Sequence, residues 1–154
     1  MILKKPYASI EDTLRHIRLQ VAEGLAYANK NVPLFYTPID LFYWLKMRTT
    51  YIDDPKGIEL IQSLPTLLEN NFHNVSGGGD CDCTTTAMLT CLQKQKFGKH
   101  SWIKLAGRNK LYPVHIWAGV DYREKELSLD LTNKMPNIER KYPYVQKIYF
   151  KPLK

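Results

Sequence analysis

The two halves of the chain carry residue patterns that favour different secondary structures. After Ser9, apolar residues recur every three or four positions, as on one face of a helix; they are Ile10, Leu14, Ile17, Val21 and Leu25. The second half holds segments rich in β-branched or aromatic residues, as strands are, at about 100–106, 112–120, 126–132 and 144–150. Helices followed by antiparallel strands predict an α+β fold.

Short polar sequences mark where helices of the first half begin. Ser9 with Asp12 is typical of a capping box. Residues 37–40 place a cap residue, a proline and an acid in the order expected at a helix start. A turn is expected at 53–57, and a short helix near Pro65.

A third helix is expected after the glycine run 76–80, which would form a flexible approach to it. This helix should run from about Cys81 to Lys96. Gly98 is then free to adopt the left-handed conformation that often ends helices.

Length and composition indicate one globular domain over residues 1–154. Hydrophobic residues make up 44% and charged residues 24%, which is ordinary for a globular protein. No segment approaches the roughly 18 apolar residues of a membrane span, and the N-terminus lacks the apolar run of a signal peptide. We therefore expect no membrane association and a cytoplasmic protein, or one packaged from a cytoplasm.

The cysteines and the charge suggest neither disulfides nor a cofactor. Three cysteines, an odd number, lie within 81–91. A Cys-x-Cys pair can bind metal, but the other ligands of a structural zinc site are hard to find, so we expect no metal and no cofactor. The net charge of +7 would suit an acidic partner, yet the basic residues are spread along the chain. The hypothesis that the chain is a nucleic-acid-binding module rests on this net charge alone.

Cys81 is the first candidate for chemistry, because it follows the glycine run and opens a predicted helix. Free backbone amides and the helix dipole at such a position favour a thiolate, and the same amides can hold a developing oxyanion. A buried, inert cysteine is the alternative.

His115 and Asp130 become partners if 112–120 and 126–132 pair as a hairpin turning at 122–123. His115 then lies directly opposite Asp130. This register makes one face apolar, through Val114–Leu131, Ile116–Leu129 and Ala118–Leu127, and leaves Trp117–Ser128 and Gly119–Glu126 on the face of His115. Taken singly, His115 could be a structural histidine on a half-buried strand, and Asp130 a residue that caps the next turn. With Cys81 they supply a nucleophile, a base and a group that orients the base.

At these positions the chain resembles the transglutaminase-like superfamily. Gly79-Asp80-Cys81-Asp82, then His115, then Asp130-Leu131-Thr132 is similar to the small cysteine-peptidase-like domains of bacteria and their phages. Residues 51–57 and 61–65 also resemble the approach to the nucleophile in that family, so the likeness spans about 41–132. It implies a papain-related core with Cys81, His115 and Asp130 as the catalytic residues.

The chain departs from the family pattern at two positions. Cys83 stands where these domains have a second aspartate, and Leu131 stands where they have a proline. The side chain of an oxyanion hole is not evident; Gln62 is a candidate, and a solvent-facing polar residue is the alternative. We assign surface or structural roles to His16, His73 and His100, and expect the tyrosines, such as Tyr142 and Tyr144, to line the core and a groove.

The expected function is that of a thiol-dependent hydrolase, a peptidase or amidase, with a peptide or protein as substrate. Transfer of the acyl group to an amine, as in a transglutaminase, is a variant of the same chemistry. The rival hypothesis is a structural or assembly protein, such as a component of a phage particle with other phage structural proteins as partners, which keeps the fold with little activity.

Overall fold

The structure is a computed structural model that describes residues 2–5, 9–54, 59–69, 77–110 and 113–153. Its elements in chain order are β1 (Ile2–Lys5), α1 (Ile10–Asn31), α2 (Pro38–Lys46), β2 (Thr50–Tyr51), β3 (Glu59–Gln62), α3 (Leu64–Glu69), β4 (Gly78–Gly79), α4 (Cys81–Lys94), the 3-10 helix η1 (Lys96–His100), β5 (Ser101–Gly107), β6 (Pro113–Tyr122), β7 (Lys125–Ser128) and β8 (Tyr144–Tyr149).

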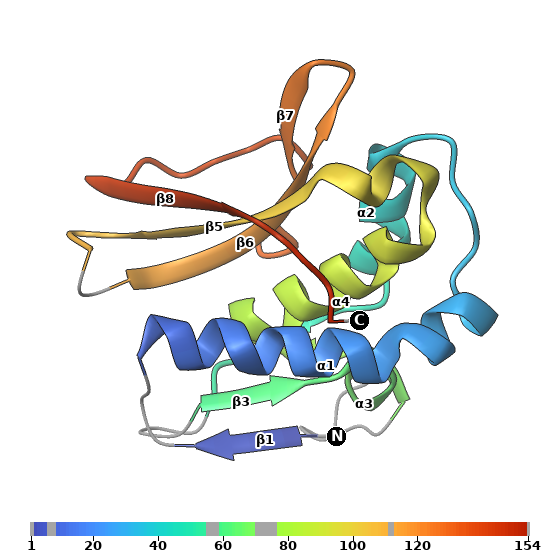
Figure 1. The fold of residues 1–154 in the computed structure, drawn as a ribbon, viewed down its shortest axis with the longest axis horizontal. Helices are drawn as coiled ribbons and strands as arrows, with labels where there is room; N and C mark the ends of the chain where they lie inside the picture. Colours follow the sequence, from blue (N-terminus) through green and yellow to red (C-terminus); the bar gives the residue numbers. More distant parts are fainter. Residues whose placement is uncertain (1, 6–8, 55–58, 70–76, 111–112, 154) are drawn as a thin grey trace.

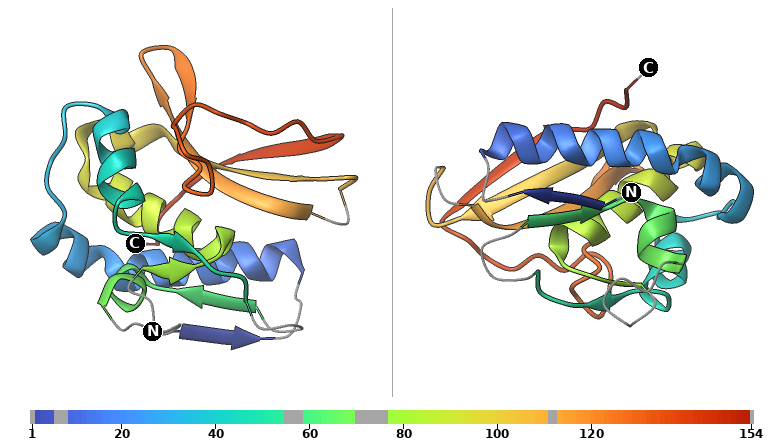
Figure 2. Two further views of the ribbon diagram at one scale, coloured as in Figure 1. Left: turned by 180° about the vertical axis from the view of Figure 1, so that it is seen from behind. Right: turned by 90° about the horizontal axis from the view of Figure 1, so that it is seen from below.

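A buried central helix, α4, organises these elements in layers (Figure 1). On one side lies a four-stranded antiparallel sheet in the order β7-β6-β5-β8. On the other side lie α1 and β3, and β3 pairs with β1. The view from behind shows the same order of layers (Figure 2, left). The α+β prediction is thus confirmed.

Because α4 is enclosed on both sides, its polar residues need partners within the protein. The hydroxyls of Thr86 and Thr90 donate to the carbonyls of Asp82 and Thr86, at 2.8 and 2.7 Å. The hydroxyl of Thr85 donates to the Ile116 carbonyl on β6 at 3.3 Å. This last bond fixes the first turns of α4 against the sheet.

The predicted helix starts are confirmed. The Ser9 hydroxyl accepts from the Asp12 amide at 3.2 Å, and the Thr37 hydroxyl accepts from the Asp40 amide at 3.3 Å. The short helix near Pro65 is α3. Most of the turn expected at 53–57 lies outside the described residues.

The glycine run is not merely a flexible approach, and this corrects the sequence interpretation. Gly78–Gly79 form β4, which pairs in parallel with β2; the Thr50 and Ile52 amides donate to the carbonyls of Gly77 and Gly79, each at 2.9 Å. A Cβ at Gly79 would lie 2.6 Å from the Cβ of Cys83. Glycine therefore lets this strand pass close beside α4.

Two further expectations for the first part of the chain were incomplete or wrong. The first half contains the short strands β1 to β4 as well as helices, because strands of two to four residues are too short to show a clear period. The third helix ends at Lys94, and Gly98 does not have a positive φ. Glycine is required at 98 because a Cβ there would lie 1.7 Å from the Leu92 carbonyl oxygen.

Candidate active site

His115 and Asp130 form a close hydrogen-bonded pair. The Nε2 atom of His115 lies 2.6 Å from Oδ2 of Asp130, and their side chains are only 10% and 5% exposed. The other carboxylate oxygen of Asp130 accepts from the Thr132 amide at 3.0 Å and from the Thr132 hydroxyl at 2.7 Å. The Asp-Leu-Thr sequence thus holds its carboxylate in place through its own turn.

The hydrogen bonds of Asp130 determine the charge of its carboxyl group and the tautomer of His115. Burial acts to raise the pKa of Asp130, but the hydrogen bonds from His115 and Thr132 outweigh it and lower the pKa. An ionised carboxylate can only accept, so the proton of a neutral His115 is assigned to Nε2. The Nδ1 atom then keeps the lone pair that a general base needs.

The pair forms in a register that differs from the prediction. The hairpin pairs Val120 with Leu127 and Gly119 with Ser128, so its turn lies one residue further along, at 123–124, and each pairing partner shifts by two residues. Asp130 lies beyond the end of β7. The predicted direct opposition of His115 to Asp130 is therefore wrong, as are these further pairs: Val114–Leu131, Ile116–Leu129, Ala118–Leu127, Trp117–Ser128 and Gly119–Glu126. A shift of two residues keeps every side chain on its predicted face, which is why the two still meet.

Cys81 is the first residue of α4 and lies beside the strand that carries His115. Its thiol sulfur accepts a hydrogen bond from the backbone N–H of Ile116, the residue after His115. Cys81 is half-buried, whereas Cys83 and Cys91 are fully buried. Cys83 faces the other way, and its thiol donates to the Leu60 carbonyl of β3 at 3.2 Å.

The surroundings of the Cys81 thiol raise its pKa, contrary to the expectation from its position at a helix start. Burial raises its pKa well above the ordinary value, the carboxylates of Asp82 and Asp80 raise it further, and the Ile116 N–H opposes them. Within the described part of the chain, no hydrogen bond joins this thiol to His115.

Asp80 caps α4 and occupies most of the amides at its start. Its carboxylate accepts from the Asp82 and Cys83 amides at 3.1 and 3.4 Å, and its carbonyl accepts from the Thr84 amide at 3.0 Å. Burial and a hydrogen bond with Asp54 raise the pKa of Asp80 to about 8. Of the four amides from Cys81 to Thr84, that of Cys81 alone has no partner among the described residues.

Gln62 is not brought to Cys81. Its side-chain amide donates to the Gly78 carbonyl at 3.0 Å and lies 3.5 Å from the sulfur of Cys83. Gln62 is buried rather than solvent-facing, because β3 turns this side chain towards α4. It supports β4, and the prediction of an oxyanion-hole role is not supported by its position.

An aromatic cluster covers His115. The rings of Trp117 and Tyr142 stack with its imidazole at centroid distances of 5.4 and 6.2 Å. Trp117 is fixed in turn, since its indole N–H donates to the Ser128 hydroxyl at 3.3 Å. The cluster limits the motion of the imidazole.

A groove of about 430 Å³ opens beside His115. The described residues that line it are Tyr51, Val114, His115, Thr132, Arg140 and Tyr142. Sequence reasoning assigned no site role to Tyr51 or Arg140, because only the fold brings them to His115. Tyr142 was expected to line a groove, and it does.

Of the other described histidines, neither His16 nor His100 lines this groove. His100 lies in η1, His16 lies in α1, and His73 is outside the described residues. Over the described ranges, no group of three or more His, Cys, Asp or Glu side chains could hold a metal ion. Nor does any described helix combine the length and apolar character needed to cross a bilayer.

No family model, curated protein or solved structure matches this chain. The candidate site is therefore defined by its geometry.

Proposed function

We propose that the chain is a thiol-dependent hydrolase of the transglutaminase-like type, a peptidase or amidase acting through Cys81, His115 and Asp130. The observation that carries the proposal is the 2.6 Å hydrogen bond between His115 and Asp130. His115 lies on β6, and the backbone N–H of the next residue, Ile116, donates to the Cys81 thiol sulfur. Nucleophile, base and orienting carboxylate thus meet where α4 begins against β6.

In the first step the Cys81 sulfur attacks the carbonyl carbon of the scissile amide, and His115 Nδ1 accepts the thiol proton. The imidazolium, paired with Asp130, gives this proton to the leaving nitrogen as the C–N bond breaks, and a thioester remains. In the second step His115 takes a proton from water, the hydroxide attacks the thioester, and the carboxylic acid leaves as Cys81 recovers its proton.

The backbone N–H of Cys81 is the donor we assign to the oxyanion. The amides of Asp82, Cys83 and Thr84 are used by Asp80, so the Cys81 amide is the member of this turn that can receive a new acceptor. A backbone donor held by a helix needs no reorganisation when charge develops.

Because a raised pKa favours the protonated thiol of Cys81, we assign to His115 the role of a base that accepts the thiol proton during the attack. Hydrogen bonds between nucleophile and base are often long or absent without substrate and tighten when it binds. The fixed Nε2 proton and the stacked rings keep His115 ready for this role.

The rival is a structural or assembly protein, such as a component of a phage particle, and two observations favour it. The raised pKa of Cys81 and its lack of a hydrogen bond to His115 within the described residues are also what an inactive relative would show.

Replacing Cys81 by alanine separates the two functions. Hydrolysis of a library of fluorogenic peptide amides should fall by orders of magnitude, while the free energy of unfolding changes by at most about 1–2 kcal/mol. Cys83→Ala is the matched control, since it removes the neighbouring thiol and should keep turnover. Peptide hydrolysis that persists in Cys81→Ala would overturn the enzyme proposal, as would a wild type that cleaves no peptide while its assembly or binding is unaffected by the change.

A further inference from the structure

The groove beside His115 carries one permanent charge. Of the six described residues that line it, only Arg140 is always ionised, because an arginine side chain does not lose its proton in proteins. No described residue forms a hydrogen bond or ion pair with its guanidinium, and the side chain is exposed. A cation held at a groove wall without an acid beside it is available to a ligand.

The acids near the groove are already occupied by other groups. Asp130 is bonded to His115 and Thr132, and Asp53 accepts a hydrogen bond from the phenol of Tyr51. The ammonium of Lys46 adds positive charge near Asp130, where it donates to the Leu131 carbonyl at 2.6 Å. Because Arg140 has no ion-pair partner among the described residues, it is the charged side chain of the lining that can pair with an anion entering the groove.

The groove is also linked to the thiol. His115 and Tyr51 both line it, Ile116 next to His115 donates to the Cys81 sulfur, and Cys81 raises the pKa of Tyr51. A volume of about 430 Å³ lies within the roughly 300–1,000 Å³ of ordinary ligand sites. A group of residue size therefore fits the groove that Arg140 and His115 both line.

We propose that the substrate carries a carboxylate close to the scissile amide, and that Arg140 binds it in a two-pronged ion pair while Tyr51 and Tyr142 flank it. Arginine suits this role because its planar fork matches the two oxygens of a carboxylate. The assignment rests on the proposed function, since it places the carboxylate relative to a bond that Cys81 attacks.

A pair of alkylating probes tests this without knowledge of the substrate. Iodoacetate adds a carboxymethyl group to the thiol sulfur and iodoacetamide adds a carbamidomethyl group. In both reactions an S–C bond forms, the C–I bond breaks, iodide leaves and the thiol proton is released, so the two probes differ in carrying a carboxylate or a neutral amide. The measured quantity is the ratio of their rates at Cys81, followed by mass spectrometry. Arg140→Gln should lower the iodoacetate-to-iodoacetamide ratio by about two- to fivefold, and Arg140→Glu by more, because opposite charges at close range attract. The matched control, Arg123→Gln, removes an equal charge from the exposed β6–β7 turn and should leave the ratio unchanged.

The outcomes separate this inference from the proposed function. If iodoacetamide modifies Cys81 but the ratio is the same in wild type and Arg140→Gln, or falls equally in Arg123→Gln, the carboxylate assignment is wrong and the thiol site stands. If iodoacetamide does not modify Cys81 at all, the proposed nucleophile is inaccessible and both proposals fall. A ratio that drops only in the Arg140 variants supports the assignment, and peptides with an acidic group beside the cleaved bond should then be cleaved fastest.

Discussion

At the scale of single residues, the triad assignment depends on the two oxygens of Asp130. One oxygen holds His115, and the other receives two bonds from Thr132. The family resemblance suggested the role of Asp130, and the predicted strand pairing placed it on the same face of the sheet as His115. The turn that orients the carboxylate could not be foreseen, because it depends on how the chain leaves β7.

Asp130→Asn should disable the site while preserving its shape. The asparagine oxygen would keep the two Thr132 donors, so its amide nitrogen would face Nε2 of His115 and force the proton to Nδ1. Peptide hydrolysis should fall by about 10²–10⁴, as when the orienting carboxylate is lost from other triads. The free energy of unfolding should also become less dependent on acid below the ordinary pKa of 3.8, because a lowered pKa contributes stability that disappears as Asp130 is protonated. Hydrolysis rates equal to those of wild type would remove Asp130 from the mechanism.

Asp80 should make the protein less stable as pH rises. Its pKa is about 8 instead of 3.8, so the folded state holds a proton that the unfolded chain releases across this range. The free energy of unfolding should therefore decline between these two values. Asp80→Asn keeps an oxygen for the Asp82 and Cys83 amides and can donate to Asp54. The Asp80→Asn variant should therefore show a smaller decline in the free energy of unfolding with pH, and should be more stable than wild type at pH 8 by about 1–3 kcal/mol. Urea unfolding across pH measures this, and an unchanged slope in the variant would contradict the raised pKa.

At the scale of elements, the β6–β7 hairpin explains why the face of His115 was predictable and its register was not. Alternating polarity assigns side chains to faces, and a shift of two residues leaves that assignment intact. The register depends on the turn, and Arg123 and Glu124 occupy it with φ of 51° and 64°. A two-residue turn with positive φ angles normally contains Asn or Gly, so the residues Arg123 and Glu124 did not indicate a turn at this position.

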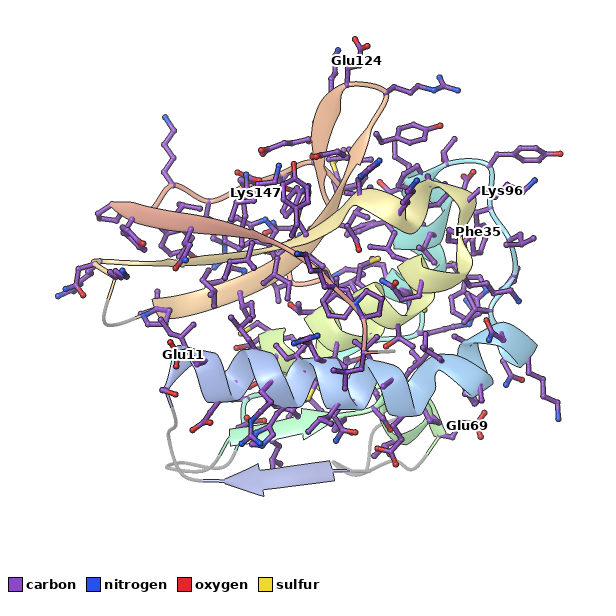
Figure 3. The ribbon with its side chains drawn as sticks, viewed as in Figure 1. Glu11, Phe35, Glu69, Lys96, Glu124 and Lys147 are labelled. Atoms are coloured by element: carbon purple, nitrogen blue, oxygen red, sulfur yellow. The ribbon has the colours of Figure 1, made fainter. Side chains whose placement is uncertain are left out.

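The same turn offers a stability test. Glu124, labelled in Figure 3 at the tip of the hairpin, carries a left-handed conformation that costs a non-glycine residue about 1 kcal/mol. Glu124→Gly should raise the melting temperature by about 2–4 °C. Glu124→Ala removes the same carboxylate without freeing the backbone, and should give no increase. A glycine variant that melts no higher than the alanine variant would mean that the turn differs from this one.

At the scale of the whole molecule, local patterns predicted the elements of the site but not the contacts between them. Helix caps and strand composition are local, so α4 and the sheet were expected where they are found. The burial that raises the pKa of Cys81, and the arrival of Arg140 at the groove, come from packing between distant segments. Lys147, labelled in Figure 3, is a similar case, since it joins Asp121 and Glu126 across the sheet at 3.2 and 3.0 Å.

The most direct test of the central claim, that His115 serves Cys81, is the rate of iodoacetamide labelling at Cys81 in wild type and His115→Ala near neutral pH. Mass spectrometry distinguishes this thiol from the buried Cys83 and Cys91, which should stay unlabelled in both proteins. His100→Ala, in the exposed end of η1, is the control for loss of a histidine. If His115 takes the Cys81 proton, labelling should slow by about tenfold or more in His115→Ala and not in His100→Ala. Labelling of Cys81 at the wild-type rate in a folded His115→Ala protein would show that the two residues do not act together.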